Sequence, residues 1–292
     1  MFTGTYTAIV TPFKNGALDE AALEHLVKLQ IKGGVDGVVP VGTTGESPTV
    51  DYEEHIKIIA LTVKFAAGRI KVLAGTGSNA SSEAIHLTQA AEKTGADGSL
   101  LVAPYYNKPT QEGLYQHFRA IAKATRLPIV LYSIPGRCGI EIGAETVKRL
   151  AREYKNIVGI KEAGGSCDRV SQLRAVTGPK FTILSGDDSL TLPFMAVGAQ
   201  GVISVASNVI PREVSQMVKL FSTGKAAAAL RIHEKYFPLF RDLFIETNPT
   251  PVKAALAMMK LIEEEYRLPL VPMDPKNWDT LRTTLKRCNV LE

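Results

Sequence analysis

The chain has 292 residues, 45% hydrophobic and 22% charged, and its 34 basic and 29 acidic residues leave a formal net charge of +5. This is an ordinary globular composition with enough chain for a large core, and the small positive charge suits small anionic substrates only mildly. With no basic run interleaved with aromatics, no apolar segment of membrane-spanning length and no targeting pattern at the N-terminus, we expect a cytoplasmic protein with no nucleic-acid or membrane partner.

Eight short apolar runs recur along the chain, and most neighbouring runs are separated by an amphipathic segment. The runs cover residues 6–10, 37–41, 71–75, 98–103, 128–132, 157–161, 181–185 and 201–205. The amphipathic segments cover residues 23–31, 79–94, 111–125, 144–154, 167–176 and 212–221. Alternation of apolar strands with helices predicts a parallel sheet covered by helices, and eight repeats favour a closed (β/α)8 TIM barrel over an open doubly wound sheet.

The pattern changes after residue 205, where no further strand is convincing. Helical patterns follow over residues 212–221, 226–244, 251–265 and 278–287, and Pro251 is a typical first residue of a helix. We therefore expect the barrel over residues 1–224 and an appended C-terminal helical segment over residues 225–292.

In a barrel of this kind the active site lies at the carboxyl ends of the strands. The residues found there are Thr11 and Pro12, the turn 42–46, residues 76–79 and 104–107, Tyr132 and Arg137, Lys161, residues 186–188, and Ser204. A lysine, several tyrosines, two threonines and an arginine on one rim indicate a functional site.

Lys161 is the centre of this prediction. It ends a β-branched run and precedes a glycine-rich turn, so its amine is expected to be partly desolvated. Desolvation favours the neutral amine, which is the nucleophile that a Schiff base with a 2-oxo acid requires. Tyr132 ends the preceding strand, and with Thr44 and Tyr106 it can form a chain of hydroxyls that relays protons. The alternatives are a solvated lysine and a tyrosine packed in the core.

Two further features suit carboxylates. The turn from Gly42 to Gly45 can offer backbone N–H groups and threonine hydroxyls to one carboxylate. The Arg137 guanidinium can bind a second carboxylate through two parallel hydrogen bonds. A plain turn and a solvated surface arginine are the competing interpretations.

Other chemistries have less support. Residues 71–80 contain G-x-G-x-x-A between a strand and a helix, but this dinucleotide-like pattern lies on the third strand and no acidic residue ends the next one. Three cysteines and five histidines are scattered without ligand spacing. We therefore expect no cofactor and no metal.

Four motifs carry a resemblance to a known family. The sequence of residues 42–47, 104–107, 131–137 and 159–163, in this order, resembles the dihydrodipicolinate synthase family of the pyruvate-dependent N-acetylneuraminate lyase superfamily, and the similarity extends from residues 2–12 to 248–253. The resemblance implies a class I aldolase-like lyase that condenses pyruvate with L-aspartate-4-semialdehyde to give 4-hydroxy-tetrahydrodipicolinate, in lysine and diaminopimelate synthesis.

The resemblance also implies roles for residues. Lys161 would form the Schiff base, Tyr132, Tyr106 and Thr43 or Thr44 would relay protons, and Thr44 would hold the pyruvate carboxylate. Carbonyls at Gly186 and Ile203 would line the pocket, and Arg137 would bind the second substrate. Tyr106 would reach into a neighbouring subunit, which implies a tight dimer, usually paired into a homotetramer.

A lysine effector site is a separate expectation from the same resemblance. Ser47, His55, Asn79, Glu83 and Tyr105 match positions that line it at the dimer interface. The sequence departs from many inhibited members at Tyr52, where they have histidine, and at Pro48, where a small residue is usual.

Two other functions stay open at this point. One is a related pyruvate-dependent aldolase or lyase acting on a sugar acid or keto acid, which would share Lys161 and Tyr132 but lack activity towards aspartate semialdehyde. The other is a catalytically idle barrel retained as a binding protein, which would form no imine with pyruvate.

Overall fold

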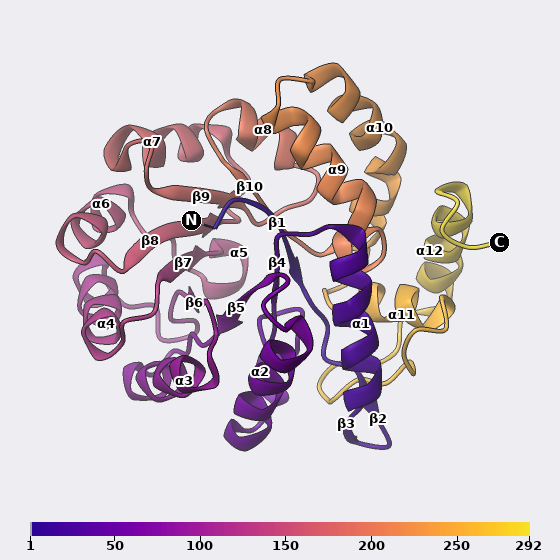
Figure 1. The fold of residues 1–292 in the computed structure, drawn as a ribbon, viewed down its shortest axis with the longest axis horizontal. Helices are drawn as coiled ribbons and strands as arrows, with labels where there is room; N and C mark the ends of the chain where they lie inside the picture. Colours follow the sequence, from indigo (N-terminus) through magenta and orange to yellow (C-terminus); the bar gives the residue numbers. More distant parts are fainter. Residues whose placement is uncertain (1) are drawn as a thin grey trace.

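The computed structural model describes residues 2–292, and its centre is a closed barrel of eight parallel strands in the order β1-β10-β9-β8-β7-β6-β5-β4. The barrel strands are β1 (Gly4–Ala8), β4 (Gly37–Val39), β5 (Lys71–Gly75), β6 (Gly98–Val102), β7 (Ile129–Ser133), β8 (Ile157–Glu162), β9 (Thr182–Ser185) and β10 (Gly201–Ser204). Each of the eight expected runs overlaps one of these strands, and the prediction of a TIM barrel is confirmed (Figure 1).

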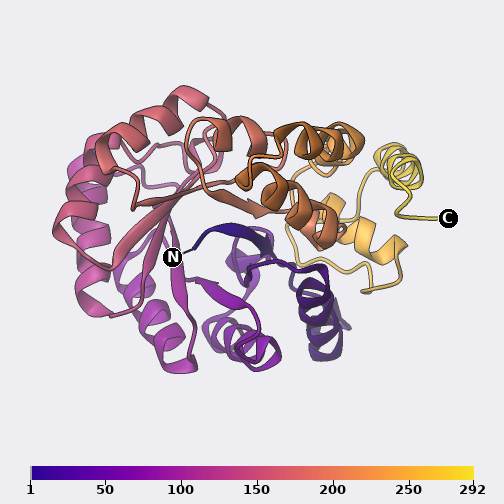
Figure 2. The same cartoon turned by 45° about the horizontal axis from the view of Figure 1, so that its top comes forward.

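Helices surround the barrel (Figures 1 and 2). They are α1 (Glu20–Gly33), α2 (Tyr52–Ala66), α3 (Ser81–Thr94), α4 (Gln111–Ala124), α6 (Ala144–Glu153), α7 (Cys167–Thr177), α8 (Thr191–Ala196) and α9 (Pro211–Ser222). Several of these helices have an N-cap residue whose side chain accepts a hydrogen bond from a backbone amide of the first turn. These N-caps include Asp19 for α1, Asp51 for α2 and Thr110 for α4. Such caps satisfy amides that the helix itself leaves unpaired.

The apolar core has two layers. Inside the barrel, side chains such as Tyr6, Leu73 and Leu100 pack together with Val130 and Tyr132. A larger layer fills the space between the strands and the helices. The alternation of strand side chains assigns each residue to one layer, so which strand residues reach the active site depends on the phase of each strand.

The C-terminal part is helical, with α10 (Ala226–Asp242), α11 (Thr250–Met258) and α12 (Pro275–Arg287) beside the barrel (Figure 2). The predicted helix over residues 251–265 is too long. Amides of Lys260 and Leu261 donate to the carbonyls of Ala257 and Leu256, and Lys260 is left-handed with φ 60°, which closes α11 in a Schellman-type end. No glycine signalled this stop. The division of the chain at residue 224 stays a prediction.

Some elements were absent from the predicted pattern. They are α2, α8, the 3-10 helices η1 (Ser47–Thr49) and η2 (Ala206–Asn208), the short α5 (Pro135–Cys138) and the hairpin of β2 (Phe13–Lys14) with β3 (Ala17–Leu18). In the described part of the chain, no helix combines the length and apolar character needed to cross a membrane.

Candidate active site

Lys161 faces the inside of the barrel because β8 contains a bulge. Ile129 of β7 pairs with Ile157, but Val130 pairs with Gly159, so β8 holds one extra residue at Val158. Strict alternation would put Lys161 on the same side as Ile157, which packs in the outer layer. The bulge shifts the phase, so that Lys161 pairs with the inward-facing Tyr132.

The Lys161 side chain is deeply buried. The residue is 6% exposed, and its Nζ lies 4.1 Å from the centroid of the Tyr132 ring. The pKa of Lys161 is lowered to about 7, mainly by burial; the Asp188 carboxylate acts in the opposite direction, and the Arg137 guanidinium contributes to the lowering. A substantial neutral fraction therefore exists near pH 7, as a nucleophilic amine requires. The predicted desolvation of this lysine agrees with its surroundings.

The Tyr132 side chain is hydrogen bonded with Thr43, in the turn that follows β4. Burial raises the pKa of Tyr132, while Arg137 and a hydrogen bond with Thr43 lower it. Thr43, Tyr132 and Ser47 line a cavity of about 30 Å³ inside the barrel mouth. A cavity of this size with hydroxyl groups in its lining can hold water. The tyrosine and the threonine can thus exchange protons next to Lys161.

Asn248, just before α11, connects the two predicted carboxylate-binding groups. Its Nδ2 donates to Thr44 Oγ1 at 3.0 Å, and its backbone oxygen accepts from Arg137 Nη2 at 2.9 Å. Because Thr44 Oγ1 accepts here, its hydroxyl proton is left for another acceptor, such as a substrate carboxylate. The Asn248 Oδ1 atom is buried and has no hydrogen-bond partner among the described residues.

Gly186 and Ile203 lie beside this site. A Cβ at Gly186 would be 2.7 Å from the Ala163 Cβ and 3.0 Å from the Lys161 Cε, so only glycine leaves room for the lysine. Ile203 on β10 is fully buried in the inner layer of the core. Both predicted pocket residues are therefore in the barrel interior or at its mouth.

Tyr106 is placed differently from the other predicted residues. It is 90% exposed and has the left-handed φ of 72°. Within one chain its ring projects into solvent and is not packed among the inner-layer side chains. The chain by itself therefore brings Lys161, Tyr132, Thr43, Thr44 and Arg137 together, without Tyr106.

Four of the five predicted effector residues line a second cavity of about 320 Å³, together with Pro48 and Tyr52. These four are Ser47, His55, Glu83 and Tyr105. Asn79 is adjacent, and its Nδ2 donates to the Tyr105 carbonyl at 3.2 Å. Hydrogen bonds from Ser78 and Tyr52 lower the pKa of Glu83, so this carboxylate is ionised and able to bind a cation.

The glycines of the dinucleotide-like segment have a packing role. A Cβ at Gly75 would lie 2.5 Å from the Val41 carbonyl oxygen, and one at Gly77 would lie 2.4 Å from the Val102 amide nitrogen. Close approach of neighbouring strands accounts for both. Among residues 2–292, no group of three or more His, Cys, Asp or Glu side chains is arranged to hold a metal ion.

Sequence reasoning assigned no role to Asn248 or Asp188. Asp188 is buried, and it accepts from Ser204 Oγ at 2.5 Å and from the amides of Val205 and Ala206 at 3.0 and 2.9 Å. Burial raises its pKa to about 6. Position at a strand end was a signal for Asp188, but Asn248 lies far from any strand and only tertiary packing reveals it.

Comparisons with known proteins agree with this geometry. A family model described as the dihydrodipicolinate synthetase family matches residues 1–288. The 4-hydroxy-tetrahydrodipicolinate synthase of Persephonella marina is 52% identical over 287 residues, which are 98% of each chain. The structure of 4-hydroxy-tetrahydrodipicolinate synthase from Methylacidiphilum fumariolicum SolV has a TM-score of 0.98 and 60% identity, covering 99% of this chain and 96% of that one.

A further similar structure is that of the Cyanidioschyzon merolae enzyme with lysine bound, which has a TM-score of 0.97, 42% identity and 99% coverage of both chains. Its fold matches this chain over nearly its full length. Because the family model and all these relatives span nearly the entire sequence, the chain belongs to the dihydrodipicolinate synthetase family.

Proposed function

We propose that the chain is a lyase that condenses pyruvate with L-aspartate-4-semialdehyde to give 4-hydroxy-tetrahydrodipicolinate, in lysine and diaminopimelate synthesis. Lys161 forms the Schiff base. The observation that carries the proposal is a buried lysine, with its pKa lowered to about 7, directly beside the Tyr132 ring. The relatives named as 4-hydroxy-tetrahydrodipicolinate synthases support the same product.

The first half of the reaction takes place at Lys161. Its neutral Nζ attacks the keto carbon of pyruvate, and the keto oxygen gains protons and leaves as water. Tyr132, hydrogen bonded with Thr43, relays these protons. The free proton of Thr44 is donated to the pyruvate carboxylate, because Asn248 already donates to the Thr44 oxygen. Loss of a methyl proton then turns the imine into an enamine.

The second half joins the two substrates. The enamine carbon attacks the aldehyde carbon of the semialdehyde, and the aldehyde oxygen is protonated to a hydroxyl. The substrate amine next attacks the imine carbon and displaces Lys161, which regains its free amine. Arg137 holds the second carboxylate, and backbone carbonyls at Gly186 and Ile203 line the pocket.

Tyr106 completes the relay from a neighbouring copy in this proposal. Its ring is exposed in a single chain, on a strained backbone that holds it outward. We expect a tight dimer, paired into a homotetramer, and sedimentation of the purified protein measures this directly. In the assembled protein, Tyr106→Phe is expected to lower turnover by about tenfold to 100-fold, since it removes one relay hydroxyl.

L-Lysine is the proposed effector, bound in the 320 Å³ cavity beside Ser47 and Glu83. Glu83 receives the α-amine, and the polar loop receives the carboxylate. Ser47 and Gly77 line both this cavity and the one that touches Tyr132, which gives a short route between them. If millimolar lysine leaves the turnover of the purified enzyme unchanged, this part of the proposal fails. The cytoplasmic location stays a prediction.

The decisive experiment is borohydride reduction in the presence of pyruvate, with peptide mass mapping, beside a coupled assay supplied with aspartate semialdehyde. Pyruvate reduced onto Lys161 together with turnover is the expected result. Trapping without turnover would instead indicate a relative that acts on a sugar acid or keto acid. Absence of trapping would refute the Schiff-base mechanism.

A further inference from the structure

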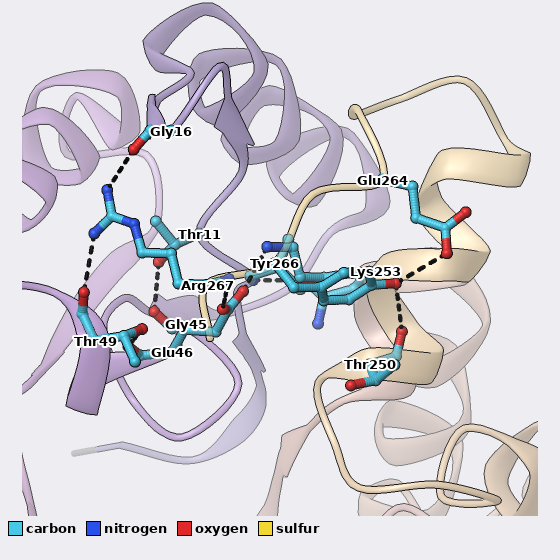
Figure 3. Close-up of polar contacts among 12 residues, drawn as sticks. Thr11, Gly16, Gly45, Glu46, Thr49, Thr250, Lys253, Glu264, Tyr266 and Arg267 are labelled. Carbon is cyan, nitrogen blue, oxygen red and sulfur yellow. Dashed lines mark hydrogen bonds and ion pairs between the residues drawn. The ribbon is translucent and has the colours of Figure 1, made fainter. Parts of the chain in front are cut away.

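A buried ion pair lies directly behind the Thr43–Thr44 turn. Glu46 and Lys253 have side chains that are 1% and 0% exposed, and Glu46 Oε1 lies 2.5 Å from Lys253 Nζ. Figure 3 shows Lys253 reaching from α11 towards the N-terminal turn that holds Glu46. Burying two charges is costly, and such pairs are often replaceable by apolar residues without loss of stability. A contribution to stability therefore does not by itself account for this pair.

Lys253 of the ion pair lies in the same segment as Asn248, and both residues restrain the Thr43–Thr44 turn. Residues 248–253 hold the turn at two points, because Asn248 binds the Thr44 hydroxyl and Lys253 binds Glu46 two residues later. Thr11 holds the turn from the segment that follows β1, since its Oγ1 donates to the Gly45 carbonyl at 2.7 Å. The short stretch that carries Thr43 and Thr44 is thus fixed on three sides.

The backbone at Glu46 requires such restraint. Its φ of 56° is left-handed, which is unfavourable for a residue with a Cβ. The second carboxylate oxygen accepts from the Arg267 amide at 3.2 Å, and the Lys253 Nζ lies 4.5 Å from the centroid of the Phe13 ring. The ion pair is therefore enclosed by rings and backbone, and it holds a strained residue in place.

We infer that Glu46 and Lys253 are positioning residues, which keep the Thr43–Thr44 turn at the distance from Tyr132 and Lys161 that proton relay requires. They act through the turn and touch no substrate. Hydrogen bonds weaken steeply with distance and angle, so a small displacement of Thr43 would interrupt the relay. The inference rests on the proposed Schiff-base reaction.

The test is the double variant Glu46→Gln/Lys253→Met, which removes the tether without leaving a buried charge unpaired. We expect a folded protein whose kcat falls about tenfold to 100-fold, as a displacement of under 1 Å near reacting groups can cause. The rate of imine formation with pyruvate is expected to fall by a similar factor. The pH midpoint of imine formation stays unchanged, because the surroundings of Lys161 do not change.

The matched control is Lys14→Met/Glu263→Gln. This ion pair also links the N-terminal part to the C-terminal segment, but it is 3.5 Å long and its side chains are 54% and 62% exposed. We expect wild-type kcat and wild-type imine formation in this control.

A second variant tests the same turn without changing a charge. Thr11→Val removes the hydrogen bond to the Gly45 carbonyl and is expected to lower kcat by about threefold to tenfold, with the same effect on imine formation. If the double variant fails to fold, Thr11→Val decides the question alone.

Wild-type kcat and imine formation in a folded double variant would overturn the inference, whatever its melting temperature, because a purely structural pair would affect stability only. The same result in Thr11→Val would do so if the double variant does not fold. Failure of the wild-type protein to trap pyruvate would instead contradict the proposed reaction, so the two failures are distinguishable.

Discussion

Lys161 at the barrel mouth and Lys253 in the C-terminal segment are both buried with their amines beside aromatic rings, and they differ in their contact with a carboxylate. Lys253 has a carboxylate 2.5 Å from its amine, whereas the Lys161 amine faces the Tyr132 ring, and its pKa is about 7. Burial lowers the pKa of both lysines, and at Lys253 the contacting Glu46 carboxylate acts against that shift and favours the charged form. A buried lysine can therefore serve as a nucleophile or as a structural cation, depending on the partner that the fold supplies.

The largest expected effect comes from Lys161→Ala. We expect a folded protein whose turnover falls by about a thousandfold or more, since the variant loses the covalent step rather than core packing. Steady-state assays with circular dichroism measure both quantities. A folded variant that retains the wild-type rate would contradict the central role of Lys161.

The main effect expected for Lys253→Met is on stability, in addition to the loss of kcat that removal of the Glu46 tether causes. This single variant leaves the Glu46 carboxylate buried and unpaired, which is expected to cost about 3 to 5 kcal/mol in the free energy of unfolding. Chemical denaturation measures this quantity if unfolding is reversible. A stability equal to that of wild type would show that Glu46 finds another partner or becomes protonated.

Arg137 lies where the two regions meet, because it donates to the Asn248 carbonyl. Arg137→Met is expected to raise the KM for aspartate semialdehyde by about tenfold to 100-fold, since a charge-assisted hydrogen-bond pair is lost. Trapping of pyruvate on Lys161 is expected to continue. Arg152→Met, at a side chain that is 77% exposed, is the control and should leave both values unchanged. Equal loss of trapping and turnover in Arg137→Met would assign Arg137 to the first half-reaction instead.

The pH dependence of imine formation should follow the lowered pKa of Lys161. Below about pH 7 the neutral fraction decreases about tenfold per pH unit, so the rate should fall as the pH falls and level off above the pKa. Pre-steady-state measurement of imine formation tests this. A midpoint near 10 would mean that the amine is solvated in the working enzyme.

The free energy of unfolding should also depend on pH because of the lowered pKa of Lys161. The unfolded chain keeps the ordinary lysine pKa of about 10.4, so between pH 7 and 10 it binds more protons at residue 161 than the folded chain does. The stability penalty of burying Lys161 is therefore complete below pH 7 and shrinks as the pH rises. Lys161→Met should be more stable than wild type at pH 6, by a margin that narrows towards pH 10.

The barrel was predictable because short stretches of sequence specify each of its strands and helices. Each strand is a short apolar run, and helices such as α1 follow from an amphipathic face and an Asp19 cap. Lys161, Tyr132 and the 42–46 turn were predictable as neighbours because parallel strands place their carboxyl ends on one rim. The predicted neighbours Tyr132 and Lys161 are paired directly in the sheet.

The sequence by itself determined the closed barrel, the rim that bears Lys161 and the type of chemistry available there, since periodicity and residue type suffice for these. Only the tertiary structure decided that Lys161 points inward, because the bulge at Val158 reverses the phase that simple alternation would assign. It also decided the pairing of Glu46 with Lys253 and of Thr44 with Asn248. These partners lie about two hundred residues apart in the chain, and no local pattern specifies a contact that folding alone creates.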